Sequence, residues 1–366
     1  MKHIGIAVVA GFALSVSVSG PASAALTFDP FVTSSSLSST LGNTAAIGFS
    51  YAGNKFVGSV YFGSNNNQLY QTDLNGGSVA KFGTPVSGFS GEIYVSSSLG
   101  LGGFASRNVF AGSEASNSIV QFANDGSTQA TFVTLPNTPA GAYSGNVRGI
   151  GFDPYGQYGY DMIVTTNAGN VYRVTSGGVA TFLANVGGDA EGLDFAPQQF
   201  GNIAAGTLVV LAEGTGRLNA ITTGGVKTDL GLQFATPEML SFVPLNLGIS
   251  GNPLEGFYAA NYNVNVIKAG ASQFTPYVGD AILTEEGTHN VYQIEWNGTQ
   301  FVKNLIGAFP NQPEDGIFVT AAILNPGCEI TNTCGGTPTS VPEPGSAALF
   351  GAALAGLAWT GRRRRQ

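Results

Sequence analysis

One short apolar segment recurs along this 366-residue chain, and its spacing constrains the fold more than any other feature. Each copy opens with polar residues and continues as an apolar strand, and the clearest copies close at a proline. Those copies are residues 146–154, 189–197 and 236–244, with looser ones at 44–49, 91–97, 280–285 and 314–320. Recurrence every ~40–50 residues is typical of repeat folds, in which each unit buries its apolar faces against its neighbours.

Three further strand-like segments follow each clear copy. In the third repeat they are residues 160–166, 169–174 and 178–184, separated by polar turns. The other sets are 56–62, 68–74 and 78–82; 108–112, 118–122 and 130–134; and 207–212, 217–222 and 226–230. Four short strands in each repeat predict an all-β fold, a β-propeller of four-stranded blades.

The sequence predicts six blades across residues 42–325. The sixth is the least regular, and its expected strands are 280–285, 290–296, 300–306 and 316–323. Seven blades are the alternative, if 314–320 opens a blade that the N-terminal residues 26–32 complete. A β-sandwich or a β-solenoid is the structural rival, but groups of four strands with Gly- and Pro-containing turns favour the propeller.

Both ends of the chain have the pattern of processing signals. The basic start Met1-Lys2-His3, an apolar run at 4–18 and the small residues Ala22-Ser23-Ala24 predict a signal peptide at 1–24, with Ala25 as the mature start. Near the other end, an uncharged apolar run at 345–360 predicts a short transmembrane helix, at the short end for a ~30 Å hydrocarbon core. A cluster of arginines after such a run favours keeping that end in the cytoplasm.

The C-terminal segment combines three features in order: Pro342-Glu343-Pro344, the apolar run, and Arg362, Arg363, Arg364 and Arg365. This combination resembles the PEP-CTERM sorting signal of Gram-negative bacteria. The resemblance implies export across the inner membrane by the general secretion machinery and transient anchoring there. It also implies cleavage by an exosortase near the Pro-Glu-Pro motif and delivery to the cell surface or the extracellular space. Hosts of the family typically make exopolysaccharide and biofilm.

We therefore expect a signal peptide at 1–24, a propeller domain at 25–325, a linker at 326–340 and a sorting signal at 341–366. The linker is rich in Gly, Pro and Thr and contains both cysteines, Cys328 and Cys334. An exported pair at this spacing predicts a disulfide loop. Two free thiols, or a lipid-attachment or metal role, are the alternatives, although a metal site would need more Cys or His residues nearby.

The charge of the expected body excludes some partners. Removal of Lys2 and the four C-terminal arginines leaves nine of the 14 basic residues against 22 acidic ones, a formal net charge of −13 in place of −8. Nucleic acid and anionic lipid should repel such a body. We expect contact with the membrane only through the C-terminal segment before processing.

Histidine chemistry is nearly absent from the chain. His3 leaves with the signal peptide, and His289 lies where a turn is expected. One histidine cannot form a multi-histidine zinc site, and no nucleophile elbow, phosphate loop or dinucleotide motif is present. The sequence therefore predicts no catalytic residues.

Acidic residues provide the better candidate site. If the recurring segments are the innermost strands, their polar first residues gather at one mouth of the central channel. These positions hold Arg148, Glu191, Glu238, Glu285 or its neighbour Glu286, and Glu314 with Asp315, while Glu92 is a further member. Converging carboxylates repel one another unless a proton or cation is shared, and oxygen ligands suit Ca²⁺. The layout is similar to the calcium channel of gluconolactonase-type propellers in its placement of acids before an innermost strand. In the alternative, the acids only solvate strand ends and Arg148 pairs with one of them.

Three functions remain open at this point. The first is a surface or matrix propeller that binds polysaccharide or surface proteins in an exopolysaccharide or biofilm context. The second is a calcium-dependent hydrolase or lactonase with its site at the channel mouth. The third is a structural spacer whose channel is filled by side chains.

Overall fold

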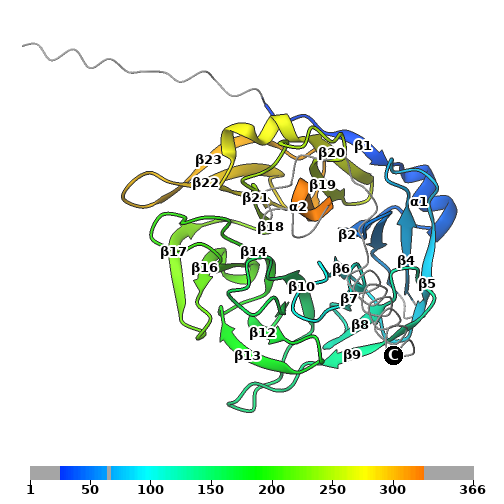
Figure 1. Ribbon diagram of the computed structural model, residues 1–366, viewed down its shortest axis with the longest axis horizontal. Coiled ribbons are helices and arrows are strands. Elements are labelled where there is room, and N and C mark those ends of the chain that lie inside the picture. Colours follow the sequence, from blue (N-terminus) through cyan, green and yellow to red (C-terminus); the bar gives the residue numbers. More distant parts are fainter. Residues whose placement is uncertain (1–24, 64–66, 325–366) are drawn as a thin grey trace, which may run out of the picture.

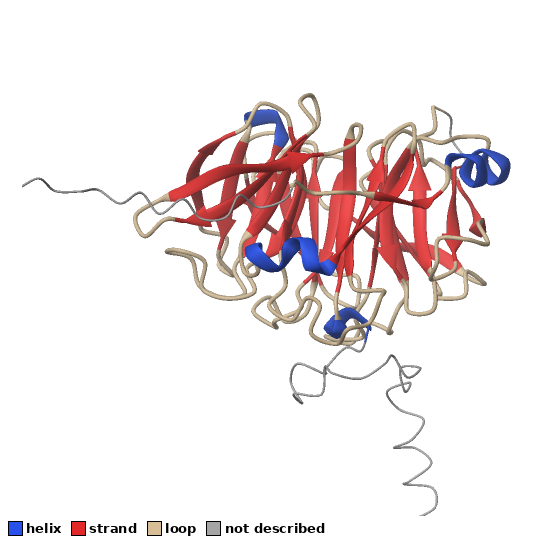
Figure 2. Ribbon diagram, turned by 90° about the horizontal axis from the view of Figure 1, so that it is seen from above, coloured by secondary structure: helices blue, strands red, loops and turns tan. Residues whose placement is uncertain are grey.

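Six four-stranded antiparallel sheets surround a central channel in the computed structural model, which describes residues 25–63 and 67–324 (Figure 1). The predicted β-propeller is confirmed, and it has six blades. In the side view the strands span the thickness of a disc whose faces carry the loops and short helices (Figure 2). The expected signal peptide, linker, disulfide and sorting signal lie outside the described residues.

The first four blades each use four consecutive strands, ordered from the channel outward. Their bounds are β2 (Ala46–Tyr51), β3 (Phe56–Val60), β4 (Asn67–Thr72) and β5 (Ala80–Val86) in blade one; β6 (Ile93–Ser97), β7 (Val109–Ser113), β8 (Ser118–Phe122) and β9 (Gln129–Thr134) in blade two; β10 (Val147–Phe152), β11 (Met162–Thr166), β12 (Asn170–Val174) and β13 (Ala180–Asn185) in blade three; and β14 (Ala190–Phe195), β15 (Leu208–Ala212), β16 (Arg217–Ile221) and β17 (Lys227–Gln233) in blade four. These agree with the expected strands to within a few residues.

Blades five and six exchange strands. Blade five consists of β18 (Pro237–Phe242), β21 (Ala281–Glu285), β22 (Asn290–Trp296) and β23 (Phe301–Ala308). The hairpin β19 (Gly256–Asn261) and β20 (Asn265–Gly270) is inserted between the first two of these strands and pairs into blade six. Blade six is completed by the innermost strand β24 (Pro313–Val319) and the outermost strand β1 (Asp29–Val32). Both ends of the described chain therefore close the ring, and in Figure 1 the blue β1 lies beside β20.

Three expectations about this region are wrong. Residues 280–285 form the second strand of blade five and not an innermost strand. The segment 316–323 is not the outer strand of that blade, because β24 lines the channel as the first strand of blade six. The N-terminal segment does join the blade that β24 opens, but this blade is the sixth, so there is no seventh. The physical reason is non-local pairing, since β19 pairs with both β20 and β24.

Short helices follow several strands of the ring. Helix α1 (Ser34–Leu41) follows β1, and the Thr33 hydroxyl caps it by accepting a hydrogen bond from the Ser36 N–H at 3.2 Å. Helix α2 (Ala321–Leu324) follows β24, and the 3₁₀ helices are η1 (Glu213–Thr215) and η2 (Ala271–Tyr277). Within the described residues no helix has both the length and the apolar character needed to span a membrane.

The core lies between neighbouring blades and includes an aromatic cluster where the ring closes. The ring of Phe31 on β1 packs edge-on against Tyr258 at 4.8 Å and against Phe56 at 5.2 Å, and Phe49 stacks on Phe56 at 5.0 Å. These rings come from β1, blade one and blade six. Aromatic contacts of this kind add to the burial of apolar surface, so they fasten the N-terminal strand to the ring.

Candidate binding site at the channel mouth

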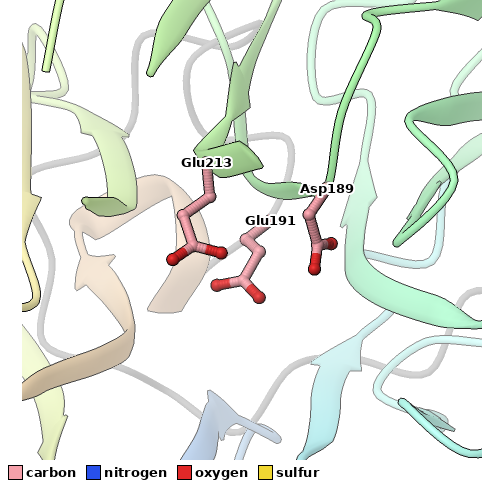
Figure 3. A group of neighbouring side chains, drawn as sticks. All are labelled: Asp189, Glu191 and Glu213. Carbon is pink, nitrogen blue, oxygen red and sulfur yellow. The ribbon is translucent and has the colours of Figure 1, made fainter. Parts of the chain in front are cut away.

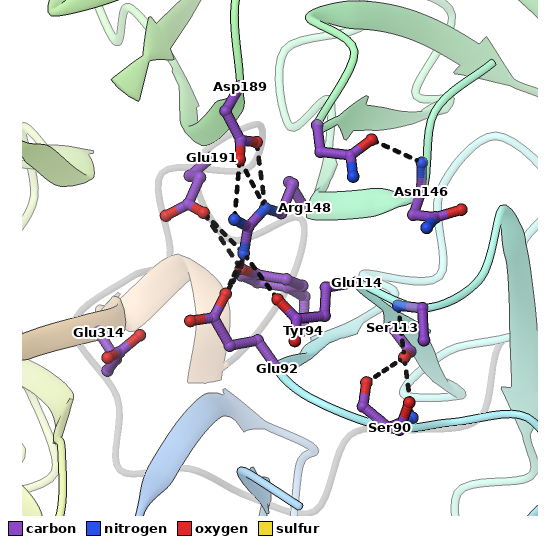
Figure 4. A network of polar contacts seen from close by, with 12 residues as sticks. Ser90, Glu92, Tyr94, Ser113, Glu114, Asn146, Arg148, Asp189, Glu191 and Glu314 are labelled. Atoms are coloured by element: carbon purple, nitrogen blue, oxygen red, sulfur yellow. Dashed lines mark hydrogen bonds and ion pairs between the residues drawn. The ribbon is translucent and has the colours of Figure 1, made fainter. Parts of the chain in front are cut away.

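The innermost strands β2, β6, β10, β14, β18 and β24 contact one another in cyclic order around the channel. Polar residues at the beginnings of five of them meet at one mouth, as predicted. They are Glu92 directly before β6, Arg148 on β10, Glu191 on β14, Glu238 on β18 and Glu314 on β24. Figure 4 shows Glu92, Arg148 and Glu191 in contact, with Glu314 on the far side of the opening.

Arg148 is the centre of this network. Its Nε and Nη2 donate to Asp189 at 2.8–3.1 Å, and its Nη1 lies 3.0 Å from Glu191 Oε1 and 3.4 Å from Glu114 Oε2. Nη1 also contacts Glu92 Oε2. Burial lowers the pKa of Arg148, but Tyr94 and the surrounding carboxylates outweigh this and raise it above its usual value. One guanidinium is thus shared by four carboxylates.

Glu191 and Glu238 form a second feature of the mouth. Their carboxyl groups lie within hydrogen-bonding reach of each other, so either one can donate to the other when it is protonated. Burial raises the pKa of Glu191 to about 8, against the opposing effect of Arg148. Burial, together with Glu191 and Glu314, holds the pKa of Glu238 well above its ordinary value. These carboxyls therefore retain protons at a pH at which exposed ones are ionised.

Further carboxylates extend the cluster beyond the first strand residues. One carboxylate oxygen from each of Asp189, Glu191 and Glu213 lies within 4.8 Å of the others, and Figure 3 shows these side chains pointing toward one another. Glu213, Glu238 and Glu286 meet the same condition. The shared residue, Glu213, begins η1. Oxygen ligands at this spacing fit a hard divalent cation such as Ca²⁺.

Two of the expected site residues lie elsewhere. Glu285 is at the end of β21, where it accepts hydrogen bonds from the Ala235 N–H at 2.9 Å and the Thr288 hydroxyl at 2.8 Å. Burial raises its pKa, but these hydrogen bonds outweigh burial and lower it. Its neighbour Glu286 is the residue that joins the mouth. The expectation that Glu285 opens an innermost strand is wrong, because β21 is a second strand.

Asp315 lies deeper, in the channel wall. It accepts a hydrogen bond from the Gly316 N–H at 2.9 Å and one from the Phe49 N–H on the neighbouring blade, and burial raises its pKa to about 7. Asp194 is placed in the same way, since it accepts from Phe242 N–H on the next blade at 2.6 Å. Its pKa is likewise raised to about 7 by burial. Both side chains link neighbouring innermost strands.

Sequence reasoning missed Glu114, Asp189 and Glu213 as site residues. Glu114, Glu213 and Glu286 share a position, because each directly follows the second strand of its blade. Second strands run antiparallel to innermost strands, so their last residues reach the mouth at which the innermost strands begin. This recurrence would have identified Glu114, Glu213 and Glu286 from the sequence, whereas Asp189 directly precedes β14. His289 lies in the turn after β21 with a left-handed φ of 57°, as expected for a turn residue.

Behind the mouth, the channel contains a cavity of about 280 Å³. Arg148, Glu191 and Glu238 line its acidic end. The remaining wall combines apolar side chains, among them Ile150, Leu193 and Leu240, with the acids Asp194 and Asp315. Its far end includes Ala322 and Ile323 of α2.

One protein-family model matches the C-terminal end of the chain. Residues 340–365 match the model described as the PEP-CTERM protein-sorting motif. The chain carries a PEP-CTERM sorting signal. This motif implies an exported protein that is transiently anchored in the membrane of a Gram-negative bacterium and processed by an exosortase. The motif covers the predicted Pro342-Glu343-Pro344 and arginine features, so the resemblance drawn from the sequence is confirmed.

No curated protein sequence matches the chain significantly, and the solved structures that it resembles have low sequence identity. A nidogen/laminin complex contains a chain with 15% identity and a TM-score of 0.48, over 75% of this chain and 84% of that one. A streptogramin B lyase has 12% identity and a TM-score of 0.46, over 81% and 92%. A catalytically inactive virginiamycin B lyase from Staphylococcus aureus with quinupristin has 15% and 0.45, over 77% and 88%. Likeness at this level identifies neither ligand nor activity.

Proposed function

We propose that this PEP-CTERM protein enters the general secretion machinery by residues 1–24, is held briefly in the inner membrane by its C-terminal segment, and is cut by an exosortase near Pro342-Glu343-Pro344. The released propeller then works at the cell surface or outside the cell, in an exopolysaccharide or biofilm context. Support comes from the matched sorting motif and from the basic, apolar and small-residue order of the N-terminus.

Mass spectrometry of the mature protein tests this route. We expect a chain that starts at Ala25 and lacks Arg362–Arg365. In a strain without the exosortase, the same measurement should recover the C-terminal arginines while the start stays at Ala25. An intact basic tail in cells that contain the enzyme would contradict the proposed processing.

For the propeller itself we propose a binding role that depends on a cation, with Ca²⁺ as the cofactor at the acidic mouth. One observation carries this: the mouth gathers a single arginine and eight carboxylates, namely Glu92, Glu114, Asp189, Glu191, Glu213, Glu238, Glu286 and Glu314. The positive charge of Arg148 neutralises only one of the eight carboxylates. The remaining acids must keep protons or share a cation, and Glu213 belongs to both groups of oxygens that could hold one.

Thermal unfolding with calcium chelated and then restored tests the cation site. A ligand that binds only the folded state raises the melting temperature, so saturating Ca²⁺ should raise it by several degrees relative to EDTA. The variant E213Q should lose most of this shift, since it removes an oxygen ligand from both groups. The control E295Q alters an acid on β22, outside the mouth, and should keep the shift. A melting temperature indifferent to EDTA in the unaltered protein would remove the calcium proposal.

A second candidate is a calcium-dependent hydrolase or lactonase, which one observation favours. Burial raises the pKa of Glu191 to about 8, and a carboxyl with a raised pKa is suited to general acid catalysis. Hydrolysis of a panel of lactones and esters, with and without Ca²⁺, tests this activity. Activity that persists in E295Q and falls at least ~100-fold in E238Q would support it, on the usual size of a general-acid contribution.

A further inference from the structure

The channel cavity differs in character between its two ends. At the mouth it meets Glu191 and Glu238, whereas two residues further along the same strands it meets Leu193 and Leu240. The neighbouring strand β10 repeats this change from Arg148 to Ile150. A ligand that fills this space is therefore polar at one end and apolar along its body.

The charge of the residues that line the cavity determines whether the polar group of a ligand is a cation or an anion. Arg148 is the single basic residue among the described residues that line the cavity, and its guanidinium already meets four carboxylates. The lining also contains the acids Asp194 and Asp315. An anionic group would enter this field without a free positive partner, so the cavity disfavours it.

Glu238 adds an independent observation. Its side chain faces the cavity and is only 8% exposed. Its neighbours are acids: Glu191 and Glu314 raise its pKa, and oxygens of Glu213 and Glu286 lie within 4.8 Å of one of its own. A buried carboxyl without a cation or an N–H donor is costly unless it is protonated or a ligand supplies the missing donor.

The far end of the cavity is covered in part by α2. The Ala321 N–H donates to Glu255 Oε1 at 3.0 Å at the start of this helix, and Arg107 Nη2 donates to the Ile323 carbonyl near its end. Ala322 and Ile323, between and beside these contacts, face the cavity. A molecule that enters by the acidic mouth thus passes the carboxyls first and finds an apolar end.

We propose that the channel binds a small amphipathic organic cation, a primary amine on an apolar body, with its ammonium group against Glu191 and Glu238 and its body against Ile150, Leu193 and Leu240. The proposal rests on the proposed cation-binding role of the mouth and assigns a ligand class to it. A volume of about 280 Å³ lies at the lower end of the ~300–1,000 Å³ range of small-molecule pockets, so the ligand is a small molecule and not a polymer segment.

The surroundings of Glu191 and Glu238 favour a cation over a neutral or anionic group. The charged and titratable groups that face Glu191 and Glu238 are Glu92, Tyr94, Arg148, Asp189, Glu213, Glu286 and Glu314. Six of these seven are acids or a phenol, which reinforces the preference for a cation.

Isothermal titration of the purified protein with hexylammonium tests the proposal. Hexanoate has the same body with the opposite charge, 1-hexanol has it without charge, and ethylammonium has the head group with little body. We expect hexylammonium to bind at least ~10-fold more tightly than 1-hexanol, as a charge-assisted hydrogen bond permits, and hexanoate to bind more weakly than either.

Two variants separate the two ends of the site. E238Q should weaken hexylammonium by about 10-fold and leave 1-hexanol within about twofold. I150W fills the apolar part, so it should weaken hexylammonium and 1-hexanol together while ethylammonium is unaffected. The matched control V179W adds the same side chain at a position that is 62% exposed and should change neither affinity.

The outcomes also separate this inference from the calcium proposal. If Ca²⁺ stabilises the protein but hexylammonium does not bind, the channel inference fails and the cation site stands. If hexylammonium binds and Ca²⁺ has no effect, the inference stands and the calcium cofactor fails. Equal affinity for hexanoate and hexylammonium, or an E238Q variant that binds hexylammonium normally, overturns the inference whatever the effect of Ca²⁺.

Discussion

Glu191 of blade four and Glu238 of blade five bring their carboxyl groups within hydrogen-bonding reach of each other across the blade boundary. Burial raises the pKa of both groups, so the native protein binds protons here more tightly than the unfolded chain does. The mouth of the channel is therefore coupled to the stability of the whole ring.

The first prediction is that stability falls as pH rises when no cation is present. The pKa of Glu191 is about 8 in the native state against an ordinary value of 4.5, and that of Glu238 is raised in the same direction. Between these pH values the native state binds more protons than the unfolded state, so the free energy of unfolding decreases toward pH 8. The slope is at most ~1.4 kcal/mol per pH unit for each such group. Urea denaturation in EDTA at pH 5, 6.5 and 8 measures it.

Variants and added calcium test which groups cause this pH dependence of the free energy of unfolding. Asp194 and Asp315, with pKa values of about 7, contribute to the same slope from the channel wall. Replacing Glu238 with Gln removes one of the protonated groups and should flatten the profile, whereas E295Q should leave it unchanged. Saturating Ca²⁺ should flatten it as well, because a cation takes the place of the protons. A free energy of unfolding that increases from pH 5 to pH 8 would contradict the raised pKa values.

The second prediction concerns Arg148. Replacement with Met leaves four carboxylates without their common partner, and removing one member of a buried ion pair typically costs about 3–5 kcal/mol. The loss should be smaller at pH 5, where the carboxyls are more easily protonated. Arg217 is the control, since its side chain is 42% exposed and lies 3.8 Å from Asp229. R217M should cost less than ~1 kcal/mol, as is usual for an exposed pair, and equal losses in the two variants would refute the central role of Arg148.

The sequence predicted blades one to four because each is formed by four consecutive strands joined by short turns. The period of the repeats and the alternation of apolar residues are local signals. In these blades the order of strands along the chain is also their order in the sheet. Blades five and six could not be predicted in this way. The hairpin β19–β20 leaves blade five after one strand, and nothing in its alternation indicates which neighbour it will join. Pairing with β24 and β1 determines which blade the hairpin joins, and these strands lie about 50 residues downstream and over 200 residues upstream of it.

The site was predictable to the same extent as the strands. Glu191, Glu238 and Glu314 were identified because each stands at the start of a recognisable innermost strand. The sequence left Glu285 and Glu286 as alternatives because β21 was read as an innermost strand, and one residue decides which way a strand side chain points. That Arg148 would meet four carboxylates depends on how neighbouring blades face each other, which the alternation within one blade does not contain.

The third prediction tests the closure of the ring by β1. Phe31 packs against Phe49, Phe56 and Tyr258, so F31A removes aromatic contacts to blades one and six at once. A large-to-small change at such a partly buried position should cost about 2–3 kcal/mol. Urea denaturation measures the loss. The control V179A removes an exposed side chain of blade three and should change stability by less than ~0.5 kcal/mol. A signal peptidase cut after Ala24 leaves this strand intact, whereas a cut beyond Val32 should destabilise the ring as F31A does.

The last prediction contrasts Arg107 with Arg148. Arg107 is only 5% exposed, and burial lowers its pKa to about 10. Its Nη2 donates to the Ile323 carbonyl and its guanidinium lies over the Tyr51 ring at 5.1 Å, but within the described residues its Nε and Nη1 have no hydrogen-bond partner. Met keeps the length of this side chain and removes the cost of burying an under-paired charge.

R107M should therefore change the free energy of unfolding by less than about 1 kcal/mol, although R148M is strongly destabilising. Its specific effect should be local, because α2 loses the hydrogen bond that Arg107 donates to Ile323. Hydrogen exchange should show faster exchange at the Ala321 and Leu324 amides in R107M, with the amides of β6 and β7 unchanged. A loss as large as that of R148M would mean that the Arg107 contacts with Tyr51 and Ile323 outweigh its two unpaired N–H groups, and the expected contrast between the two buried arginines would then be wrong.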